Sequence, residues 1–280
     1  MKYIILTLLF IGTSSNLIYS KDFKYYTKDF YDLGLDKSVG NYNPKEVQAF
    51  LRDILNSKHL KTRSYDKLVT SCSGEKKNLC YSHIQLDYSS EVRPLVMAVL
   101  TNQNEDFNGE METPYCKKRY TVKRVSGNFI FPDHTIFNVE HTVPQFHFNK
   151  NISKKLQKSD LQNLWPVFSK MNSDRGHLDF IEFKGHNHAV SFCKESELST
   201  VQGVRFFEPP HAHKGNVARA YFYFALKYKI KLPEFSIKLF KKWNKFDPVD
   251  AEEKQRASLI FKFQKNRNPF VDYPHLADLF

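Results

Sequence analysis

The pair Glu140-His141 and, thirty-one residues further on, Asn172 are the side chains of this sequence best suited to chemistry. A neutral histidine can take a proton from water because its unperturbed pKa of about 6.5 lies near working pH. A carboxylate and an amide oxygen are hard ligands of the kind that Mg²⁺ prefers, and this ion keeps several waters. We therefore expect His141 to act as general base, with Glu140 and Asn172 holding one metal ion. That is the minimum set for hydrolysis of a phosphodiester.

A strand and a helix must position these three side chains. Adjacent residues of a regular strand point to opposite faces, so Glu140 and His141 can share a site only where the backbone bends or the strand ends. We expect a helix over about 166–175, which puts Asn172 two turns in, within reach of the strand or loop that carries His141. This strand–loop–strand–helix order is the layout of a ββα-metal site.

Capping signals and apolar spacing predict the remaining elements. Asn43 can cap a helix, Pro44 suits its first position, and apolar residues then repeat at helical spacing over 47–55. The apolar run 92–101 fits a buried strand and a helix equally. We expect short β-pieces over 119–143, a polar loop over 149–159, and helices over about 217–228, 234–246 and 251–264.

The composition fits one large domain with a real core. The 280 residues are 41% hydrophobic and 15% aromatic, and the sequence shows no repeats or evident linkers. Residues 1–20 combine Lys2, a short apolar run and the small residue Ser20, which favours a cleaved secretory signal peptide over an uncleaved anchor. We expect a single α+β domain over 21–280, secreted or periplasmic, with no membrane contact after cleavage and no obligate protein partner.

The net charge of +12 favours a polyanionic partner. Between Lys214 and Arg267 there are fourteen Lys and Arg against five Asp and Glu, a local excess of 14 − 5 = +9. A basic surface of this kind would bind DNA or RNA mainly through phosphates.

The four cysteines predict disulfides, because an even number behind a signal peptide is typical of an oxidising compartment. Three connectivities are open, and the short first loop favours Cys72–Cys80 with Cys116–Cys193. None of the four forms a C-x-x-C pair, so a cysteine zinc site is not expected. The five loop histidines have irregular spacing and read as scattered residues rather than a zinc site: His177, His186, His188, His211 and His213.

Two polar residues near the predicted site are expected to support it. We expect Asn163 to tie a strand to the site through hydrogen bonds. Arg175 could pair with Asp160 or Asp174 to hold the core, which we favour over a catalytic role.

Arg219 has two open interpretations. It lies off the apolar face of the helix predicted over 217–228, so it could contact phosphate or the catalytic loop, or be an exposed structural arginine.

Several motifs in the same order resemble the bacterial endonuclease I family of secreted or periplasmic nucleases, and the resemblance covers nearly the whole chain after residue 20. They are FNVEHTVPQ (137–145), SDLQNLWP (159–166), MNSDRG (171–176), EPP (208–210), GNVARAYFY (215–223), KKWNKFDPVD (241–250) and NRNPFVDYP (266–274).

The resemblance implies a mixed α/β fold around a ββα-metal, or His-Me finger, core with flanking helices. It puts the base on His141 and the Mg²⁺ ligands on Glu140 and Asn172, with Mn²⁺ or Ca²⁺ as candidate replacements. It also implies cleavage of DNA, and commonly of RNA, with little sequence preference and 5′-phosphate products.

The sequence departs from the family pattern at three places. Gln162 stands where the family has a histidine, and Lys214 stands where it has an arginine. A loop arginine has no clear counterpart, although Lys154 and Lys155 occupy that loop. These departures concern the side chains that would stabilise the transition state at the phosphate, because Arg and Lys are not equivalent at a bidentate phosphate site. They leave open an alternative, a basic secreted nucleic-acid-binding protein with impaired catalysis.

Overall fold

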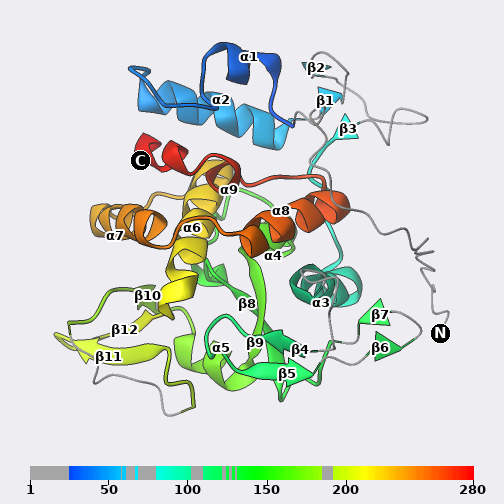
Figure 1. Cartoon of the computed structure of the whole chain (residues 1–280), viewed down its shortest axis with the longest axis vertical. Coiled ribbons are helices and arrows are strands. Elements are labelled where there is room, and N and C mark those ends of the chain that lie inside the picture. The colour runs from blue at the N-terminus through cyan, green and yellow to red at the C-terminus, as the bar shows by residue number, and fades with distance from the viewer. Residues whose placement is uncertain are drawn as a thin grey trace.

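Strands β8 (Phe137–His141) and β9 (Leu164–Phe168) run through the middle of the fold to helix α5 (Ser169–Arg175) at its lower edge (Figure 1). The two strands are antiparallel, with Glu140 opposite Trp165 and His141 opposite Leu164. The helix predicted over 166–175 is therefore wrong in its first three residues. The apolar run LWPVF pairs with β8 and is buried on it, so the helix starts only at residue 169.

The computed structural model describes residues 25–57, 59–60, 67–68, 80–101, 110–121, 124–125, 128–129, 131–184 and 192–280. The predicted signal peptide lies outside these ranges, as do Cys72, His186 and His188. Within them, no helix is both long enough and apolar enough to cross a membrane.

Helix α6 (Lys214–Tyr228) forms the central pillar of the helical half, and all of its residues except Asn216 are buried. It packs against α7, α2 and α9. Helix α8 lies to the right of α6 in Figure 1. The predictions over 234–246 and 251–264 are confirmed. These helices are α2 (Pro44–Asn56), α7 (Glu234–Phe246), α8 (Ala251–Gln264) and α9 (Pro269–Asp272).

Three further α-helices and a π-helical turn precede β9 in the described chain. Asn43 caps α2 as predicted, since its Oδ1 accepts a hydrogen bond from the Lys45 amide at 3.0 Å. The ambiguous run 92–101 is helical. The loop predicted over 149–159 contains a short helix, which Ser153 caps. These elements are α1 (Lys28–Asp32), a π-helical turn (Tyr88–Val92) leading into α3 (Arg93–Thr101), and α4 (Lys154–Lys158).

Small sheets surround the centre. Strand β12 (Val204–Glu208) pairs in parallel with β10 (Asp179–Phe180) and antiparallel with β11 (Glu197–Val201). A disulfide between Cys116 and Cys193 joins the segment after β4 to the one before β11. Cys80 is disulfide-bonded as well, and its predicted partner lies outside the described residues. The other strands are β1 (His59–Leu60), β2 (Lys67–Leu68), β3 (Cys80–Tyr81), β4 (Glu110–Glu112), β5 (Arg119–Thr121), β6 (Arg124–Val125) and β7 (Asn128–Phe129).

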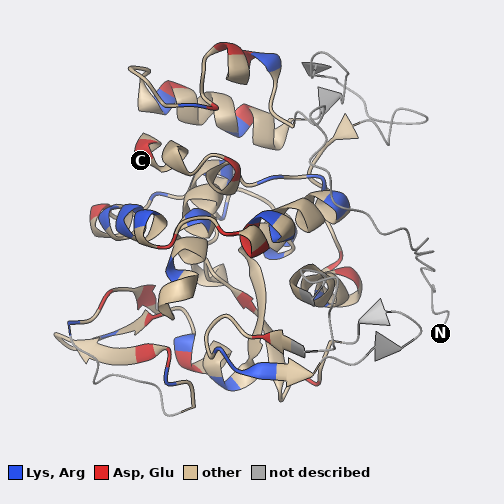
Figure 2. Ribbon diagram, in the orientation of Figure 1, with Lys and Arg blue, Asp and Glu red and all other residues tan. Residues whose placement is uncertain are grey.

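The basic segment between residues 214 and 267 does not lie wholly on the surface. Lys and Arg residues are spread along α6, α7 and α8 (Figure 2), but Lys214, Arg219, Lys227 and Arg256 are all buried with partners inside the fold. The local excess of positive charge therefore overstates the charge that a polyanion would meet.

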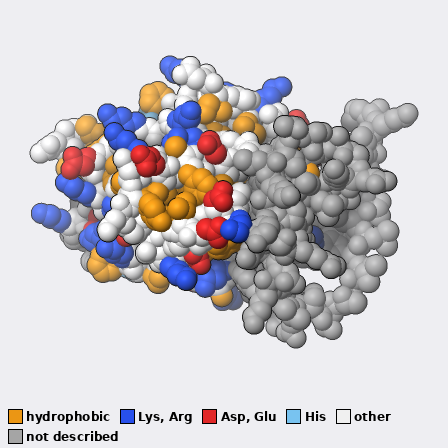
Figure 3. Space-filling model, turned by 90° about the horizontal axis from the view of Figure 1, so that it is seen from above, with side chains coloured by type: hydrophobic (Ala, Val, Ile, Leu, Met, Phe, Trp, Pro, Cys, Tyr) orange, Lys and Arg blue, Asp and Glu red, His pale blue; other side chains and the backbone are white. Residues whose placement is uncertain are grey.

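Seen from the α1–α2 end, the face of the molecule has hydrophobic side chains gathered at its centre with charged side chains around them (Figure 3). Leu33 and Tyr42, from the segments next to α1 and α2, are among the exposed large hydrophobics. Beneath this face, the main core joins Tyr25 at one end of the described chain to Leu279 at the other. The fold is thus one α+β domain.

Candidate active site

His141 is the last residue of β8, the position at which a strand can release two adjacent side chains into one site. Its Nε2 lies 3.1 Å from the carbonyl oxygen of Lys158, and its ring stacks on Tyr88 with centroids 5.7 Å apart. The side chain is only 7% exposed, and burial lowers its pKa to about 4. The imidazole is therefore neutral at pH 7. If Nε2–H donates to the carbonyl, Nδ1 is the nitrogen that can accept a proton.

The carboxylate of Glu140 is 2% exposed and is held by two side chains from other elements. Its Oε1 accepts a hydrogen bond from the Tyr115 hydroxyl at 3.0 Å and lies 3.3 Å from Arg175 Nε. Burial raises the pKa of Glu140 to about 7, while Arg175 and Tyr115 oppose the rise. Arg175 is thus the cation that favours the charged form of this buried carboxylate.

Asn172 lies in the first turn of α5 rather than two turns into a helix, because the helix starts later than predicted. Its Nδ2 is 3.5 Å from the carbonyl oxygen of Val139, the residue that precedes Glu140 on β8. The amide therefore lies over the end of the strand that carries Glu140 and His141. The structure thus places Asn172 beside the strand that carries Glu140 and His141.

The donor atoms fit a hard cation. Both side-chain contacts of Glu140 fall on Oε1, and the contact of Asn172 uses its nitrogen, so Glu140 Oε2 and Asn172 Oδ1 are the oxygens that could coordinate an ion. One carboxylate and one amide suit Mg²⁺, which fills its other positions with water and substrate phosphate. The described ranges contain no group of three or more His, Cys, Asp or Glu that could hold a metal.

Asn163 ties the two strands together beyond the site, in the role predicted for it. Its Oδ1 accepts from the Val143 amide at 2.7 Å, and its Nδ2 donates to the Val143 carbonyl at 3.1 Å. Its own carbonyl accepts from the Thr142 amide at 2.9 Å. These bonds fix the chain that leaves β8 directly after His141.

Arg175 is fully buried, but neither of its predicted partners is correct. It pairs with Glu140, and it donates to the carbonyls of His141 at 3.3 Å and Thr142 at 2.6 Å. It thereby locks the last turn of α5 against the end of β8. Sequence spacing could not find this pair, because the partners are 35 positions apart and meet only after β9 has formed.

Asp160 is instead the centre of a buried network. Its Oδ2 accepts from the hydroxyls of Tyr223 at 2.8 Å and Tyr228 at 2.6 Å and lies 3.5 Å from Lys227 Nζ. Its Oδ1 accepts from Asn266 Nδ2 at 3.3 Å. Burial opposes ionisation, yet Lys227 and the hydroxyl donors hold the pKa of Asp160 below its usual value. The other predicted partner, Asp174, pairs with Lys170 on the surface of α5.

Arg219 does not face solvent, so the expectation of an exposed arginine or a phosphate contact is wrong. It is completely buried and pairs with Glu253 of α8, and it also donates to Asn244 at 3.1 Å and to the Asp247 carbonyl at 2.8 Å. The helix periodicity missed this because Glu253, from the first turn of α8, reaches the polar side of α6.

The positions that depart from the family pattern fall into two groups. Lys214 is buried, pairs with Glu208 and lies 3.6 Å from Glu182, and Gln162 is buried, with Nε2 3.5 Å from the Asn266 carbonyl. Both therefore have structural contacts. Lys154 and Lys155 are exposed on α4, the helix whose last residue binds His141 through its carbonyl, so they remain candidates for phosphate contact.

Two residues of the site were not predicted from the sequence. Tyr115 holds the Glu140 carboxylate, and Tyr88 covers the His141 ring and itself lies beneath Lys158 Nζ at 4.1 Å. Neither stands in one of the family-like motifs, and no local pattern marks them.

Comparisons with known proteins identify the family of this chain. The model of the family described as Endonuclease I matches residues 47–275. The chain is 33% identical over 151 residues to the Endonuclease-1 of Buchnera aphidicola (subsp. Acyrthosiphon pisum), covering 49% of this chain and 59% of that protein. It is 30% identical over 148 residues to a periplasmic deoxyribonuclease of Aeromonas hydrophila, covering 48% and 62%. It is 31% identical over 160 residues to an extracellular ribonuclease of Bacillus amyloliquefaciens, covering 51% and 53%. The matched regions thus span less than two thirds of each of these relatives.

Proposed function

This chain belongs to the endonuclease I family, and on that premise we propose that it is a secreted or periplasmic, metal-dependent endonuclease. Its substrates are DNA and RNA, bound mainly through phosphates and cut without sequence specificity. The proposed domain is 21–280, after removal of a signal peptide. The names of the relatives support both substrates and both locations, because they include a periplasmic deoxyribonuclease and an extracellular ribonuclease.

The observation that carries the proposal is the meeting of a neutral histidine, a carboxylate and an amide at one strand end. His141 accepts the proton of the attacking water at Nδ1, since Nε2 is engaged with the Lys158 carbonyl. The water oxygen bonds to phosphorus while the bond to the 3′ oxygen breaks, which leaves a 5′-phosphate and a 3′-hydroxyl. When bound to Glu140 and Asn172, Mg²⁺ supplies positive charge for the phosphate oxygens.

The remaining residues position these groups. Arg175 and Tyr115 fix the orientation of the Glu140 carboxylate, and Tyr88 restricts the imidazole plane. Lys154 and Lys155 offer exposed charge on the adjacent helix for the phosphates that flank the cut. The alternative, a binding protein with impaired catalysis, fits this arrangement less well because all three chemical groups are present and assembled.

Nicking of a supercoiled plasmid by purified residues 21–280 tests the proposal. We expect cleavage with Mg²⁺, none with excess EDTA, and a loss of several orders of magnitude in His141→Ala. Mn²⁺ and Ca²⁺ would be titrated in parallel, a structured RNA would serve as second substrate, and end-labelling would identify the 5′-phosphate.

The matched control is His134→Ala, because His134 is an exposed histidine on the turn before β8. Full cleavage by this control, with DNA retardation unchanged in both variants, would assign the loss to the base. Retarded but uncut plasmid for the wild type under every metal would instead favour the binding protein.

A further inference from the structure

Two half-buried cations at the edge of the proposed active site have no acidic partner among the described residues. Lys158 is the last residue of α4, and its Nζ lies 4.1 Å from the centroid of the Tyr88 ring. Arg93 is the first residue of α3, and its guanidinium carbon lies 4.9 Å from the centroid of the Phe131 ring. Neither side chain makes a hydrogen bond with any residue in the described ranges. Both therefore keep their N–H donors for another molecule.

Tyr88 connects these cations to the histidine proposed as base. Its ring stacks on that of His141, with 21° between the two planes and 5.7 Å between the centroids. Burial raises the pKa of Tyr88 to about 12, while Arg93 opposes the rise and Glu140 adds to it. The hydroxyl is thus protonated at neutral pH and feels the charge of both residues. It makes no hydrogen bond within the part of the chain that the structure describes.

An uncommon backbone geometry holds Tyr88 in this place. Residues Tyr88–Val92 form a π-helical turn, a conformation that is rare and frequently found at functional sites. Asp87 caps the turn, since its Oδ1 accepts hydrogen bonds from the amides of Ser89 at 3.1 Å and Ser90 at 2.8 Å. None of these bonds uses the Tyr88 side chain, so the turn should survive a substitution there.

The carboxylates next to this group already have partners. Asp133 Oδ1 accepts from the amide of Thr135 at 2.8 Å and from its hydroxyl at 2.6 Å. These two bonds are the main cause of the lowered pKa of Asp133, and the charge of Arg93 adds to them. Hydrogen bonds from Ser90 are in the same way the main cause of the lowered pKa of Asp87. The two cations are therefore left for a ligand from outside.

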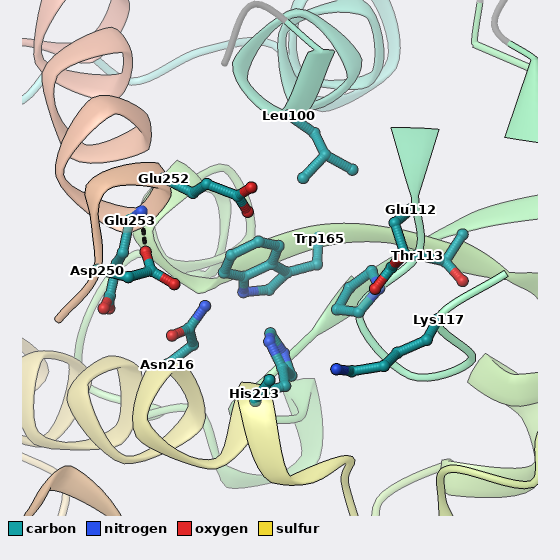
Figure 4. Close-up of a pocket in the computed structure, with 12 residues that line it drawn as sticks. Leu100, Glu112, Thr113, Lys117, Trp165, His213, Asn216, Asp250, Glu252 and Glu253 are labelled. Atoms are coloured by element: carbon teal, nitrogen blue, oxygen red, sulfur yellow. Dashed lines mark hydrogen bonds between the residues drawn. The ribbon is translucent and has the colours of Figure 1, made fainter. Parts of the chain in front are cut away.

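A cavity of about 270 Å³ beside Trp165 has the opposite character (Figure 4). Its lining includes one lysine, Lys117, and three carboxylates from β4 and from around the start of α8, those of Glu112, Asp250 and Glu252. Carboxylates repel phosphate groups, so a nucleic-acid strand is not expected to enter this cavity. Tyr88, Arg93 and Lys158 do not line it.

The chemistry of the three donors selects an anion with several oxygens. A guanidinium binds phosphate through two parallel N–H donors, an ammonium binds it as a point charge, and a phenol hydroxyl donates one hydrogen bond. The substrate of a nuclease carries such an anion at every nucleotide.

The histidine tautomer indicates which phosphate this is. His141 Nε2 faces the Lys158 carbonyl, whereas the attacking water of the proposed mechanism lies at Nδ1. The Lys158 side of the imidazole is therefore not the side of the phosphate that is cut.

We propose that Lys158, Arg93 and the Tyr88 hydroxyl bind a backbone phosphate of the substrate strand that neighbours the one being cut. The inference rests on the proposed function for the identity of the strand. Lys158 also holds His141 through its carbonyl, so a phosphate bound here fixes the strand relative to the base.

Binding of a short single strand by an inactive protein tests this subsite without cleavage. Fluorescein-labelled DNA would be titrated with residues 21–280 carrying His141→Ala, in EDTA and at several salt concentrations. Each phosphate contact contributes about 0.7 to the slope of log affinity against log salt for single strands, so Lys158→Met and Arg93→Met should each reduce the slope by about 0.7. Tyr88→Phe should weaken binding about tenfold at an unchanged slope, because the hydroxyl carries no charge.

Two controls separate binding from folding. Lys45→Met removes an exposed lysine at the start of α2 and should leave the slope unchanged. Lys158→Arg keeps the positive charge and should keep the slope. A merely structural Lys158 would instead lower the melting temperature of Lys158→Met without changing the slope.

A neutral methylphosphonate, placed at each position of the strand in turn, identifies the phosphate. Affinity should fall most at one position, next to the bond that the wild type cuts with Mg²⁺. At that position the methylphosphonate should cost Lys158→Met less than it costs the parent, because the contact is already lost.

Unchanged slopes in both methionine variants would overturn the proposal, as would methylphosphonate losses that add fully to that of Lys158→Met. The expected slopes in a protein that cuts nothing with His141 restored would keep the subsite and reject the proposed nuclease. Cleavage by the wild type together with unchanged slopes would do the reverse.

Discussion

The ion pair between Arg175 and Glu140 offers the sharpest test of how the site is held. Arg175 is completely buried, so Arg175→Met leaves the Glu140 carboxylate inside the protein without its cation. Breaking a buried pair by removing one partner costs about 3–5 kcal/mol. The carbonyls of His141 and Thr142 also lose their donor, which places the expected loss near the upper end, about 5 kcal/mol. That is a large part of a typical stability of about 5–15 kcal/mol.

The double variant Arg175→Met/Glu140→Gln separates the two contributions. It removes the stranded charge but not the unpaired carbonyls, so it should recover about 2–3 kcal/mol relative to the sum of the single variants. The measurement is urea unfolding in EDTA, with the transition midpoint compared at constant slope.

Lys170→Met is the matched control, because it breaks an exposed pair with Asp174 on the same helix and should cost about 1 kcal/mol or less. Additive losses in the double variant would show that the pair does not stabilise the site, and the reasoning would then be refuted.

Three further outcomes follow from other residues. Asn172→Ala should raise the Mg²⁺ concentration for half-maximal nicking at least about tenfold, and an unchanged metal titration would exclude its ligand role. Burial lowers the pKa of both His83 and His213 to about 3, whereas the unfolded chain protonates them near 6.5. Because the folded pKa is the lower one, stability should fall as pH drops from about 6.5 toward 3, by about 1.4 kcal/mol per pH unit for each histidine, and equal melting temperatures at pH 7 and pH 4 would contradict this. Reduction of Cys116–Cys193, which closes a loop of 77 residues, should cost roughly 4 kcal/mol in unfolding experiments, and a midpoint insensitive to reductant would count against it.

Local signals predicted the helices well. The spacing of apolar residues gave the bounds of α7 and α8, and Asn43 and Pro44 marked the start of α2, because caps and amphipathic faces act within one element. The three chemical residues could also be proposed from the sequence, since each lies in a short motif with a recognisable neighbourhood.

Long-range packing accounts for the errors. The segment around Pro166 is a strand because β8 is there to pair with it, which no local pattern reports. Arg219 is buried because Glu253 of α8 reaches it, and Arg175 binds Glu140 because β9 turns the chain back. Each of these facts depends on a partner at least 23 positions away. Sequence reasoning therefore proposed the chemical residues and the supporting role of Asn163, but it did not find Tyr115, Tyr88 or the Arg175–Glu140 pair.

The network around Asp160 has a consequence for the order in which the protein becomes active. Asp160 lies between β8 and β9 in sequence, yet its buried partners are Tyr223, Tyr228 and, close to the C-terminal end, Asn266. A chain is synthesised and exported from its N-terminus, so His141 and Asn172 emerge long before these partners. Until residue 266 arrives, the carboxylate lacks part of its support, and α6 lacks its contact with α9. We therefore expect a chain that ends before residue 266 to show little of the proposed nuclease activity, because the segment between β8 and β9 then lacks one of these partners.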